Sequence, residues 1–334
     1  MYLGIDLHQD QITVNSRNEE GITVFKGQIS TKHDNINDFF AKYASDAKKC
    51  GGYMAMFEVC GFHEWLYETL EKFECSEIVL VQPENSSNRK TDERDANTLC
   101  ELLWNNRLHL KNGNHPVGIR RVYHCSADDN EVRQLTSLKR YVTELRTKVI
   151  NKIRGLSRKH NFVQDAPSKD FKTKKVRAWL QKVELSEVDR CEMNILLSQW
   201  DLYDKQILET EAKLIKKGEA KPEVHRLDTI AGITAIGAII ILARINDINR
   251  FRNPDSLANY FGLTPGCRNS GKSTQKIGGI TKAGSSDARN VLNCAVNQQI
   301  RTDPQMKRWY SKLKHKKGPK TARVAAMRKL ATII

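Results

Sequence analysis

The residues best suited to chemistry are two aspartates near the start of an amphipathic helix. Within Lys90–Ala96, Asp92 and Asp95 stand three residues apart, ahead of an apolar-periodic run that predicts a helix. Thr91 is a candidate N-cap. Residues i and i+3 share a helix face, so both carboxylates can point at one spot, where they repel each other unless a cation lies between them. The plain alternative is an acidic first helical turn, which the helix dipole favours.

Two further carboxylates interrupt apolar strands of the same region. Asp6 lies in Tyr-Leu-Gly-Ile-Asp-Leu, and Glu58 lies in Met-Ala-Met-Phe-Glu-Val-Cys. Burying a carboxylate on a strand is costly unless it is paired or bound to a metal. If the two strands are neighbours, all four carboxylates can converge on an oxygen site for Mg²⁺, or for Mn²⁺, of the kind that clamps phosphodiester oxygens. A strand-end turn for Asp6 and an exposed edge position for Glu58 are the alternatives.

The elements that would position these carboxylates form a mixed α/β layer fold. Alternating and short apolar runs predict strands, and helical spacing predicts helices between them. The predicted elements are strands at 2–7, 11–15 and 22–27, a helix at 35–47, a strand at 53–59, a helix at 61–73, a strand at 78–81 and a helix after residue 91. This order matches a ribonuclease-H-like core.

Charge is distributed unevenly along the 334 residues. Residues 1–100 contain 10 Lys and Arg against 17 Asp and Glu, a net −7 in a chain of net +16, so the remaining residues carry +23. The last 34 residues contain 11 Lys and Arg against one Asp. A basic body joined to an acidic domain indicates a polyanionic partner. The absence of a long apolar run and the eight scattered cysteines predict a cytoplasmic protein with reduced thiols and no membrane segment.

Two long helices are predicted in the middle of the chain. Apolar residues recur in a heptad-like seam from Val132 to Leu156, and the stretch Glu187–Lys217 is also helical. Together they would form an antiparallel hairpin or an oligomerisation coil. The outer faces of the first helix are basic, which indicates binding of phosphate backbones or else ordinary solvation. The cations assigned to nucleic-acid binding here are Arg146, Lys152 and Arg154.

The last third of the chain contains a glycine turn and a long basic loop. The turn in Leu227–Thr234, followed by an apolar helix, resembles a helix-hairpin-helix whose amides could face a phosphate, although an ordinary turn fits equally well. Residues 258–284 are rich in Gly, Ser and Lys without an apolar period, which predicts a long functional loop.

Ser270 is the candidate nucleophile of this loop. Its hydroxyl lies among basic residues and could contact or attack a phosphate. Gly266–Ser273 fits the letters of a nucleotide-binding loop, but no hydrophobic strand precedes it and no apolar helix follows, which argues against that function. The neighbouring cations assigned to nucleic-acid binding are Arg268, Lys272, Lys276 and Lys282.

Several motifs, taken in order, carry a family resemblance. They are Gly-Ile-Asp6-Leu-His, Phe-Glu58, Lys-Thr-Asp92-x-x-Asp95-Ala, Gly-Leu-Thr-Pro with Asn-Ser270-Gly, and Ile-Thr-Lys-x-Gly284 with Arg289. The chain resembles the DEDD serine transposases of the Piv/MooV-like insertion-sequence family, the bridge-RNA-guided recombinases, over essentially its whole length. Two motifs depart from the family pattern. Asn269 replaces a first serine, and Ala231-Gly232-Ile233-Thr234 replaces Pro-Gly-Ile-Gly.

The resemblance implies a fold, a mechanism and partners. It implies a RuvC-like domain over 1–120, a coiled coil over 121–222 and a mainly α-helical C-terminal transposase domain over 223–334. Asp6, Glu58, Asp92 and Asp95 would bind metal, Ser270 would form a transient phosphoserine link to DNA, and Arg289 would contact nucleic acid. A noncoding bridge RNA would pair with donor and target DNA. Dimers or tetramers in the prokaryotic cytoplasm, at the nucleoid, are expected.

Three other functions stay open at this point. A metal-dependent RuvC-like nuclease or junction resolvase would use water as nucleophile, with Ser270 structural. An ATPase of the actin and sugar-kinase superfold also opens with Gly-Ile-Asp, but it needs further phosphate and adenosine loops that the sequence does not convincingly contain. A nucleic-acid-binding protein without catalysis would leave the carboxylates idle.

Overall fold

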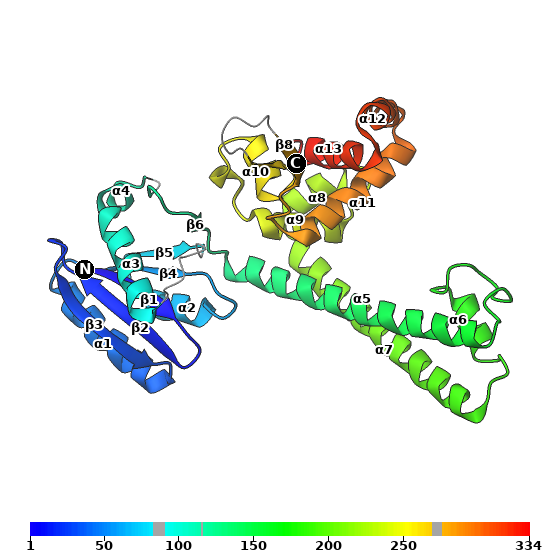
Figure 1. Cartoon of the computed structure of the whole chain (residues 1–334), viewed down its shortest axis with the longest axis horizontal. Coiled ribbons are helices and arrows are strands. Elements are labelled where there is room, and N and C mark those ends of the chain that lie inside the picture. The colour runs from blue at the N-terminus through cyan, green and yellow to red at the C-terminus, as the bar shows by residue number, and fades with distance from the viewer. Residues whose placement is uncertain (83–90, 115, 269–275) are drawn as a thin grey trace. The chain divides into compact units, whose positions relative to one another are not determined.

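The structure is a computed structural model in which residues 1–82, 91–114, 116–268 and 276–334 are described. The chain divides into two compact units, Met1–His124 and Cys125–Ile334. Figure 1 shows a sheet with flanking helices in the first unit and mostly helices in the second. A mixed α/β region followed by a helical part confirms the predicted fold class at this level. Among the described residues, no helix is both long enough and apolar enough to span a membrane.

The first unit is built on a six-stranded sheet of β1 (Tyr2–Leu7), β2 (Gln11–Arg17), β3 (Thr23–Ser30), β4 (Met54–Glu58), β5 (Glu77–Val81) and β6 (Arg121–Val122). The strand order is β3-β2-β1-β4-β5-β6. β1 pairs antiparallel with β2 and parallel with β4, and β4 pairs parallel with β5. This arrangement is consistent with the predicted ribonuclease-H-like core. The short edge strand β6 was not predicted.

Helices cover both faces of this sheet, namely α1 (His33–Lys48), α2 (Glu64–Lys72), α3 (Asp92–Asn105) and the short α4 (Arg107–Lys111). Successive residues of a strand point to opposite faces. Ile5 of β1 packs in one core with Phe40 of α1, whereas Tyr2 of β1 packs in another core with Leu99 of α3. The two cores therefore lie on opposite faces of the sheet, and the strand side chains on the face of Tyr2 point toward α3.

Helix α3 begins at Asp92, as the sequence predicts, and Thr91 occupies the N-cap position without a side-chain cap among the described residues. Thr91 has the extended backbone of an N-cap, with φ −140° and ψ 139°. Within the described part of the chain, its side chain accepts no capping hydrogen bond. The carboxylates of the first turn, which lie near the partial positive charge of the helix N-terminus, supply the remaining stabilisation.

The second unit begins with two long helices, α5 (Ala127–Lys159) and α7 (Glu187–Gly218), which lie side by side in Figure 1. Ion pairs along them join early residues of one helix to late residues of the other, so the helices are antiparallel. These pairs are Lys139–Glu211, Arg146–Asp204, Lys152–Glu192 and Lys159–Asp189. The predicted hairpin is thus present, while a supercoil between its helices remains a prediction. Leu138, counted in the predicted seam, is 50% exposed.

A short helix, α6 (Lys174–Leu180), packs at the far end of this hairpin. Val176 and Leu180 of α6 are fully buried in one core with Met193 and Trp200 of α7. This helix was not predicted, because seven residues are too few for a convincing period.

The rest of the unit is a helical bundle made of α8 (Pro222–Asp228), α9 (Ala235–Ile245), the 3₁₀ helix η1 (Ile248–Arg250), α10 (Pro254–Tyr260), α11 (Ser286–Thr302), α12 (Pro304–Lys317) and α13 (Pro319–Ala331). Asp287 of α11 accepts hydrogen bonds from Arg140 of α5 and Arg244 of α9, both at 3.0 Å. The hairpin and the bundle are therefore tied together within one unit. The predicted boundary near residue 222 remains a prediction.

Residues 258–284, predicted to be one long loop, contain two paired strands. β7 (Pro265–Arg268) pairs antiparallel with β8 (Lys276–Ile280), and α10 extends into the start of the segment. The prediction of a continuous loop was wrong. Short strands that contain glycine and lie outside a buried core show no apolar alternation from which they could be predicted.

The glycine turn between α8 and α9 has a structural explanation. Gly232 has φ +87°, and a Cβ there would lie 2.8 Å from the Cα of Ala295 on α11. The Thr234 side chain accepts a hydrogen bond from the Gly237 backbone N–H and caps α9. Glycine is thus required for the turn and for its close packing on α11, and this feature does not itself indicate a phosphate site.

Candidate active site

Asp6 and Glu58 stand near the ends of two neighbouring parallel strands. The register pairs Ile5 with Phe57, so Asp6 and Glu58 are the next residues along β1 and β4. Ile5 and Phe57 are buried in the core beneath α1 and α2. Because side chains alternate, Asp6 and Glu58 lie on the opposite face, which α3 covers. The two strands are therefore neighbours, which is the condition on which the sequence analysis let their carboxylates meet.

Gly4 allows α3 to approach β1 closely. A Cβ at this position would lie 2.3 Å from the carbonyl oxygen of Ala96 and 2.3 Å from the backbone nitrogen of Cys100. Both atoms belong to the α3 backbone, so they cannot give way unless the helix moves. The Cys100 thiol also donates to the carbonyl of Tyr2 at 3.2 Å. This contact brings the first turn of α3 to the end of β1, where Asp6 lies.

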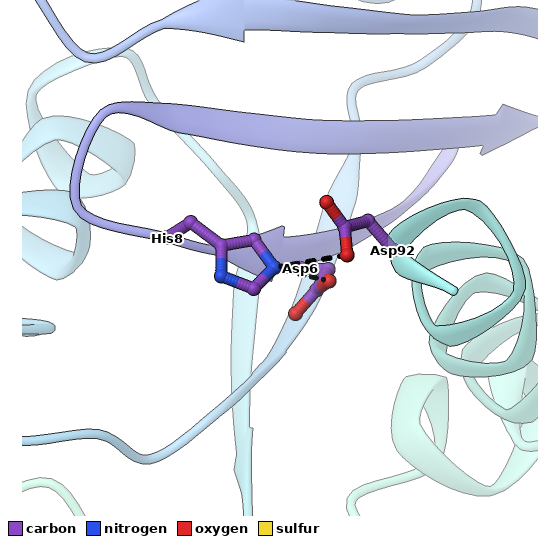
Figure 2. A group of neighbouring side chains, drawn as sticks. All are labelled: Asp6, His8 and Asp92. Carbon is purple, nitrogen blue, oxygen red and sulfur yellow. Dashed lines mark hydrogen bonds and ion pairs between the residues drawn. The ribbon is translucent and has the colours of Figure 1, made fainter. Parts of the chain in front are cut away.

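Three side chains converge at this point, as Figure 2 shows. His8 Nε2 lies 2.9 Å from Asp6 Oδ2 and 3.4 Å from Asp92 Oδ1. One ligand atom from each of Asp6, His8 and Asp92 falls within 4.8 Å of the other two. Gln11 of β2 donates its side-chain amide to Asp92 Oδ2 at 3.5 Å. Residues from two strands, the turn between them and a helix thus form one group of oxygen and nitrogen donors.

The environment of Asp6 opposes its ionisation. Its side chain is only 18% exposed, and this burial is the main cause that raises the pKa of Asp6 above its usual value. His8 lowers that pKa, whereas the negative charges of Asp92 and Asp95 raise it further. A desolvated carboxylate beside two other carboxylates is the situation that a bound cation relieves.

The four predicted carboxylates therefore differ in how closely they approach the group of Asp6, His8 and Asp92. His8 contacts both Asp6 and Asp92, and Asp95 lies near enough to Asp6 for its negative charge to raise the pKa of Asp6. Glu58 is on the adjacent strand and on the same face, but it is not a member of the three-residue group found among the described residues.

Comparisons with known proteins cover most of the chain. Residues 3–160 match the DEDD transposase family profile of the IS110 type, and residues 224–311 match the profile described as "Transposase IS116/IS110/IS902 family". The chain belongs to the IS110/IS116/IS902 transposase family. It is therefore an enzyme that cleaves and rejoins DNA, and it binds DNA.

Curated relatives agree with this assignment. The "Transposase for insertion sequence element IS1111A" of Coxiella burnetii is 23% identical over 99% of this chain and 88% of its own length. The "Putative transposase y4pF/y4sB" of Sinorhizobium fredii is 27% identical over 83% of this chain and 70% of its own length.

The residues at the end of β1 fit the divalent cation that a DEDD-type transposase implies. Carboxylate oxygens are the donors that Mg²⁺ and Mn²⁺ accept, and an imidazole nitrogen is a common ligand of transition-metal ions. Burial is the main cause that raises the pKa of Asp6, and the charges of Asp92 and Asp95 add to it, so a bound cation would favour the ionised carboxylate. Asp6, His8 and Asp92 are thus suited to hold such an ion in the transposase.

His8 is the member of this group that was not predicted from the sequence as a ligand. The signal was present in the motif Gly-Ile-Asp6-Leu-His, because residues two apart at a strand end point the same way. The four-carboxylate pattern drew attention to acidic residues alone, although His is among the commonest metal ligands.

Ser270 and Lys272 of the transposase lie outside the described residues, as do the side chains of Arg268 and Lys276. Ser270 belongs to the segment that connects β7 to β8. Lys282, which follows β8, is exposed and has φ +55°. The assignment of these residues to catalysis and to nucleic-acid binding remains a prediction.

Arg289 has a structural function that its motif did not indicate. Its guanidinium donates to the carbonyl oxygens of Phe261 at 3.0 Å and Gly284 at 2.6 Å. A Cβ on Gly284 would lie 1.9 Å from the Tyr260 carbonyl oxygen, so this glycine lets the end of the β7–β8 segment pack on α10. These contacts anchor the segment and already occupy the Arg289 side chain.

The three predicted nucleic-acid-binding cations of α5 also have partners within the hairpin. Arg146 pairs with Asp204 at 2.6 Å, and Lys152 pairs with Glu192 at 3.1 Å. The Arg154 guanidinium lies over the Phe171 ring, 5.2 Å from its centroid. A nucleic acid would have to compete with these contacts, so the hairpin is a weaker candidate surface than its charge suggests.

The strongest unbalanced charge among the described residues lies on α12 and α13. No acidic residue occurs between residues 304 and 334. Among the described residues, the ion pair that involves these two helices joins Arg328 to Asp255 at 2.9 Å. The exposed cations of α12 are Lys307, Arg308, Lys312, Lys314, Lys316 and Lys317.

Proposed function

We propose that the transposase cuts and rejoins donor and target DNA at a metal centre formed by Asp6, Asp92, Asp95 and Glu58. The convergence of Asp6, His8 and Asp92 at the end of β1, in a chain of a DEDD transposase family, carries the proposal. Carboxylates from separate elements are brought together there, in surroundings that raise the pKa of Asp6 and so disfavour its ionised form. Such an arrangement indicates a function, because stability alone would favour an uncharged side chain at this position.

The protein's own part in this chemistry is to hold and orient the site. Gln11 binds Asp92, and the close contact at Gly4 fixes α3 against β1. A divalent cation, when bound, would neutralise negative charge on a phosphodiester and favour attack on phosphorus. Glu58 and Asp95, on the same side of the sheet, add negative charge that favours retention of the cation.

The nucleophile we propose is the Ser270 hydroxyl. Attack by its oxygen on a phosphodiester forms a phosphoserine ester and releases one DNA strand end as a free hydroxyl. A second DNA hydroxyl then attacks the ester, restores the phosphodiester and returns the proton to serine. The energy of the bond is conserved, so strands are exchanged without ATP. The motif Asn-Ser270-Gly between basic residues supports this assignment.

Replacing Ser270 by Ala is expected to abolish both the covalent protein–DNA adduct and strand cleavage. The alanine variant has no oxygen with which to form the ester, whereas the carboxylates are unchanged. The measurement is denaturing electrophoresis of labelled insertion-element ends after incubation with the transposase.

Ser273→Ala is the matched control, since it removes a hydroxyl from the same segment and should retain the adduct. Unchanged cleavage by Ser270→Ala would favour the alternative, a RuvC-like nuclease or resolvase in which water attacks.

We further propose that a structured noncoding bridge RNA directs the transposase to donor and target DNA. The transposase itself would act as a dimer or tetramer. Base pairing would then supply the sequence recognition, and the protein would bind phosphates. The exposed, unbalanced cations of α12 support a phosphate-binding surface on this helix.

The transposase purified at low salt is expected to carry one defined RNA with loops complementary to two DNA sites.

Arg308, Lys312 and Lys316 repeat every four residues and share a face of α12, so replacing all three by Gln should remove about three phosphate contacts. The dependence of log affinity on log salt should then fall by about 2. Sequencing the bound RNA and titrating it at several salt concentrations measure both effects.

Lys217→Gln serves as the control, because Lys217 is already paired with Asp128 and Glu131. A random mixture of cellular RNA would contradict the bridge-RNA proposal, and an unchanged salt dependence would exclude α12 as the binding surface.

A further inference from the structure

The position of His8 bears on which metal ion the proposed centre binds. His8 follows β1 directly, and its backbone N–H donates to the Gln11 carbonyl at 3.0 Å. The Gln11 side chain in turn binds Asp92. The β1–β2 turn therefore holds the imidazole beside the two aspartates, which come from β1 and α3. The inference below rests on the proposed function of this site.

The spacing of the three donor atoms fits ligands of a single small cation. Bonds of about 2.1 Å place adjacent ligands of an octahedral ion about 3 Å apart. His8 Nε2 lies 2.9 Å from Asp6 Oδ2 and 3.4 Å from Asp92 Oδ1, and all three atoms lie within 4.8 Å of one another. Small side-chain movements would turn these contacts into one coordination shell.

The His8 side chain is also accessible, since it is 47% exposed. A buried histidine between two carboxylates could be explained as a fixed ion-pair partner. At this exposure, the imidazole can turn its Nε2 lone pair toward an entering ion, and the Asp6 and Asp92 oxygens then become its neighbours in the shell.

We propose that His8 is a direct ligand of the metal and that it makes the centre selective for Mn²⁺ over Mg²⁺. Mg²⁺ prefers oxygen donors and gives up its waters reluctantly, so an imidazole adds little to its binding. First-row transition-metal ions gain more from a nitrogen donor, and Mn²⁺ shares the octahedral oxygen chemistry that the carboxylates supply. The histidine therefore acts as a specificity-determining residue.

The test is electron paramagnetic resonance of the full-length protein loaded with Mn²⁺ alone. Pulsed spectra of the wild type are expected to show coupling of Mn²⁺ to a ¹⁴N nucleus, replaced by ¹⁵N coupling when the protein is grown with [¹⁵N]histidine. His8→Ala should lose this coupling and weaken Mn²⁺ binding at least about tenfold, while changing Mg²⁺ binding, measured by calorimetry, less than about threefold. His33→Ala, at an exposed position on α1, should behave as the wild type.

The possible failures are distinguishable. Mn²⁺ that binds the wild type and is lost in Asp92→Asn, but that shows no histidine coupling, would overturn the assignment of His8 and leave the proposed metal centre intact. Mn²⁺ binding that is unchanged in Asp92→Asn, or absent from the wild type, would overturn both. The labelled wild type needs no substitution, so the result does not depend on the folding of a variant.

Discussion

Replacing Asp92 by Asn is expected to lower the rate of DNA strand cleavage by the transposase about a thousandfold or more. The amide cannot supply the negative charge that would hold a cation between Asp92 and Asp6, and the loss of this electrostatic stabilisation corresponds to about 4 kcal/mol in the transition state. The rate of cleavage of labelled insertion-element ends, with Mg²⁺ or Mn²⁺ present, measures the effect.

The same substitution should leave the metal-free fold intact. Asp92 raises the pKa of the half-buried Asp6 carboxyl, so removing its charge relieves a repulsion that offsets the loss of a favourable carboxylate at the α3 N-terminus. Thermal unfolding without metal separates this effect from a general loss of structure.

Glu93→Gln is the matched control for Asp92→Asn. Glu93 is the next residue of α3, is 64% exposed and pairs with Lys26 at 2.8 Å. The Glu93→Gln substitution removes the same charge from the same helical turn as Asp92→Asn does, yet it should change the cleavage rate little. Equal losses in the two variants would mean that the acidity of the turn matters and that a specific site does not.

Replacing Gly4 by Ala should destabilise the first unit by about 3 kcal/mol, the upper range for inserting a group into a packed core. The new methyl group would overlap the Ala96 carbonyl oxygen and the Cys100 backbone nitrogen, so α3 must move away from β1. The exchange of α3 amide hydrogens, followed by mass spectrometry, should accelerate about a hundredfold. Because α3 carries Asp92, cleavage should fall as well.

Gly61→Ala is the corresponding control. A Cβ on Gly61 would meet no atom within 4 Å among the described residues, so exchange in α3 should be unchanged. Normal α3 exchange in Gly4→Ala would contradict the view that this glycine sets the distance between strand and helix.

Much of the first unit could be predicted from its sequence because its core elements are regular. Alternation predicted β2 and β3, and the apolar run around Glu58 predicted β4, whereas the pairing of β4 with β1 came from the structure. The same reasoning located Asp6 and Asp92, since a charged residue inside or next to an apolar pattern is conspicuous. These signals come from short stretches of sequence, so they do not depend on contacts between distant parts of the chain.

The parts that could not be predicted depend on tertiary contacts. The importance of Gly4 lies in the α3 backbone above it, and that of Arg289 lies in carbonyl groups of Phe261 and Gly284. The partners of Arg146 and Lys152 belong to α7, forty or more residues away in the sequence. A charge pattern identifies cations, but it does not tell which of them are already paired.

Crystals of the full-length transposase soaked in MnCl₂ and measured at the manganese absorption edge test the central claim most directly. An anomalous difference peak between the Asp6 and Asp92 carboxylates, within about 2.2 Å of an oxygen from each, is the result that we predict. Its absence from this position in crystals of active protein, or a peak elsewhere on the chain alone, would contradict the assignment of a metal centre to the end of β1.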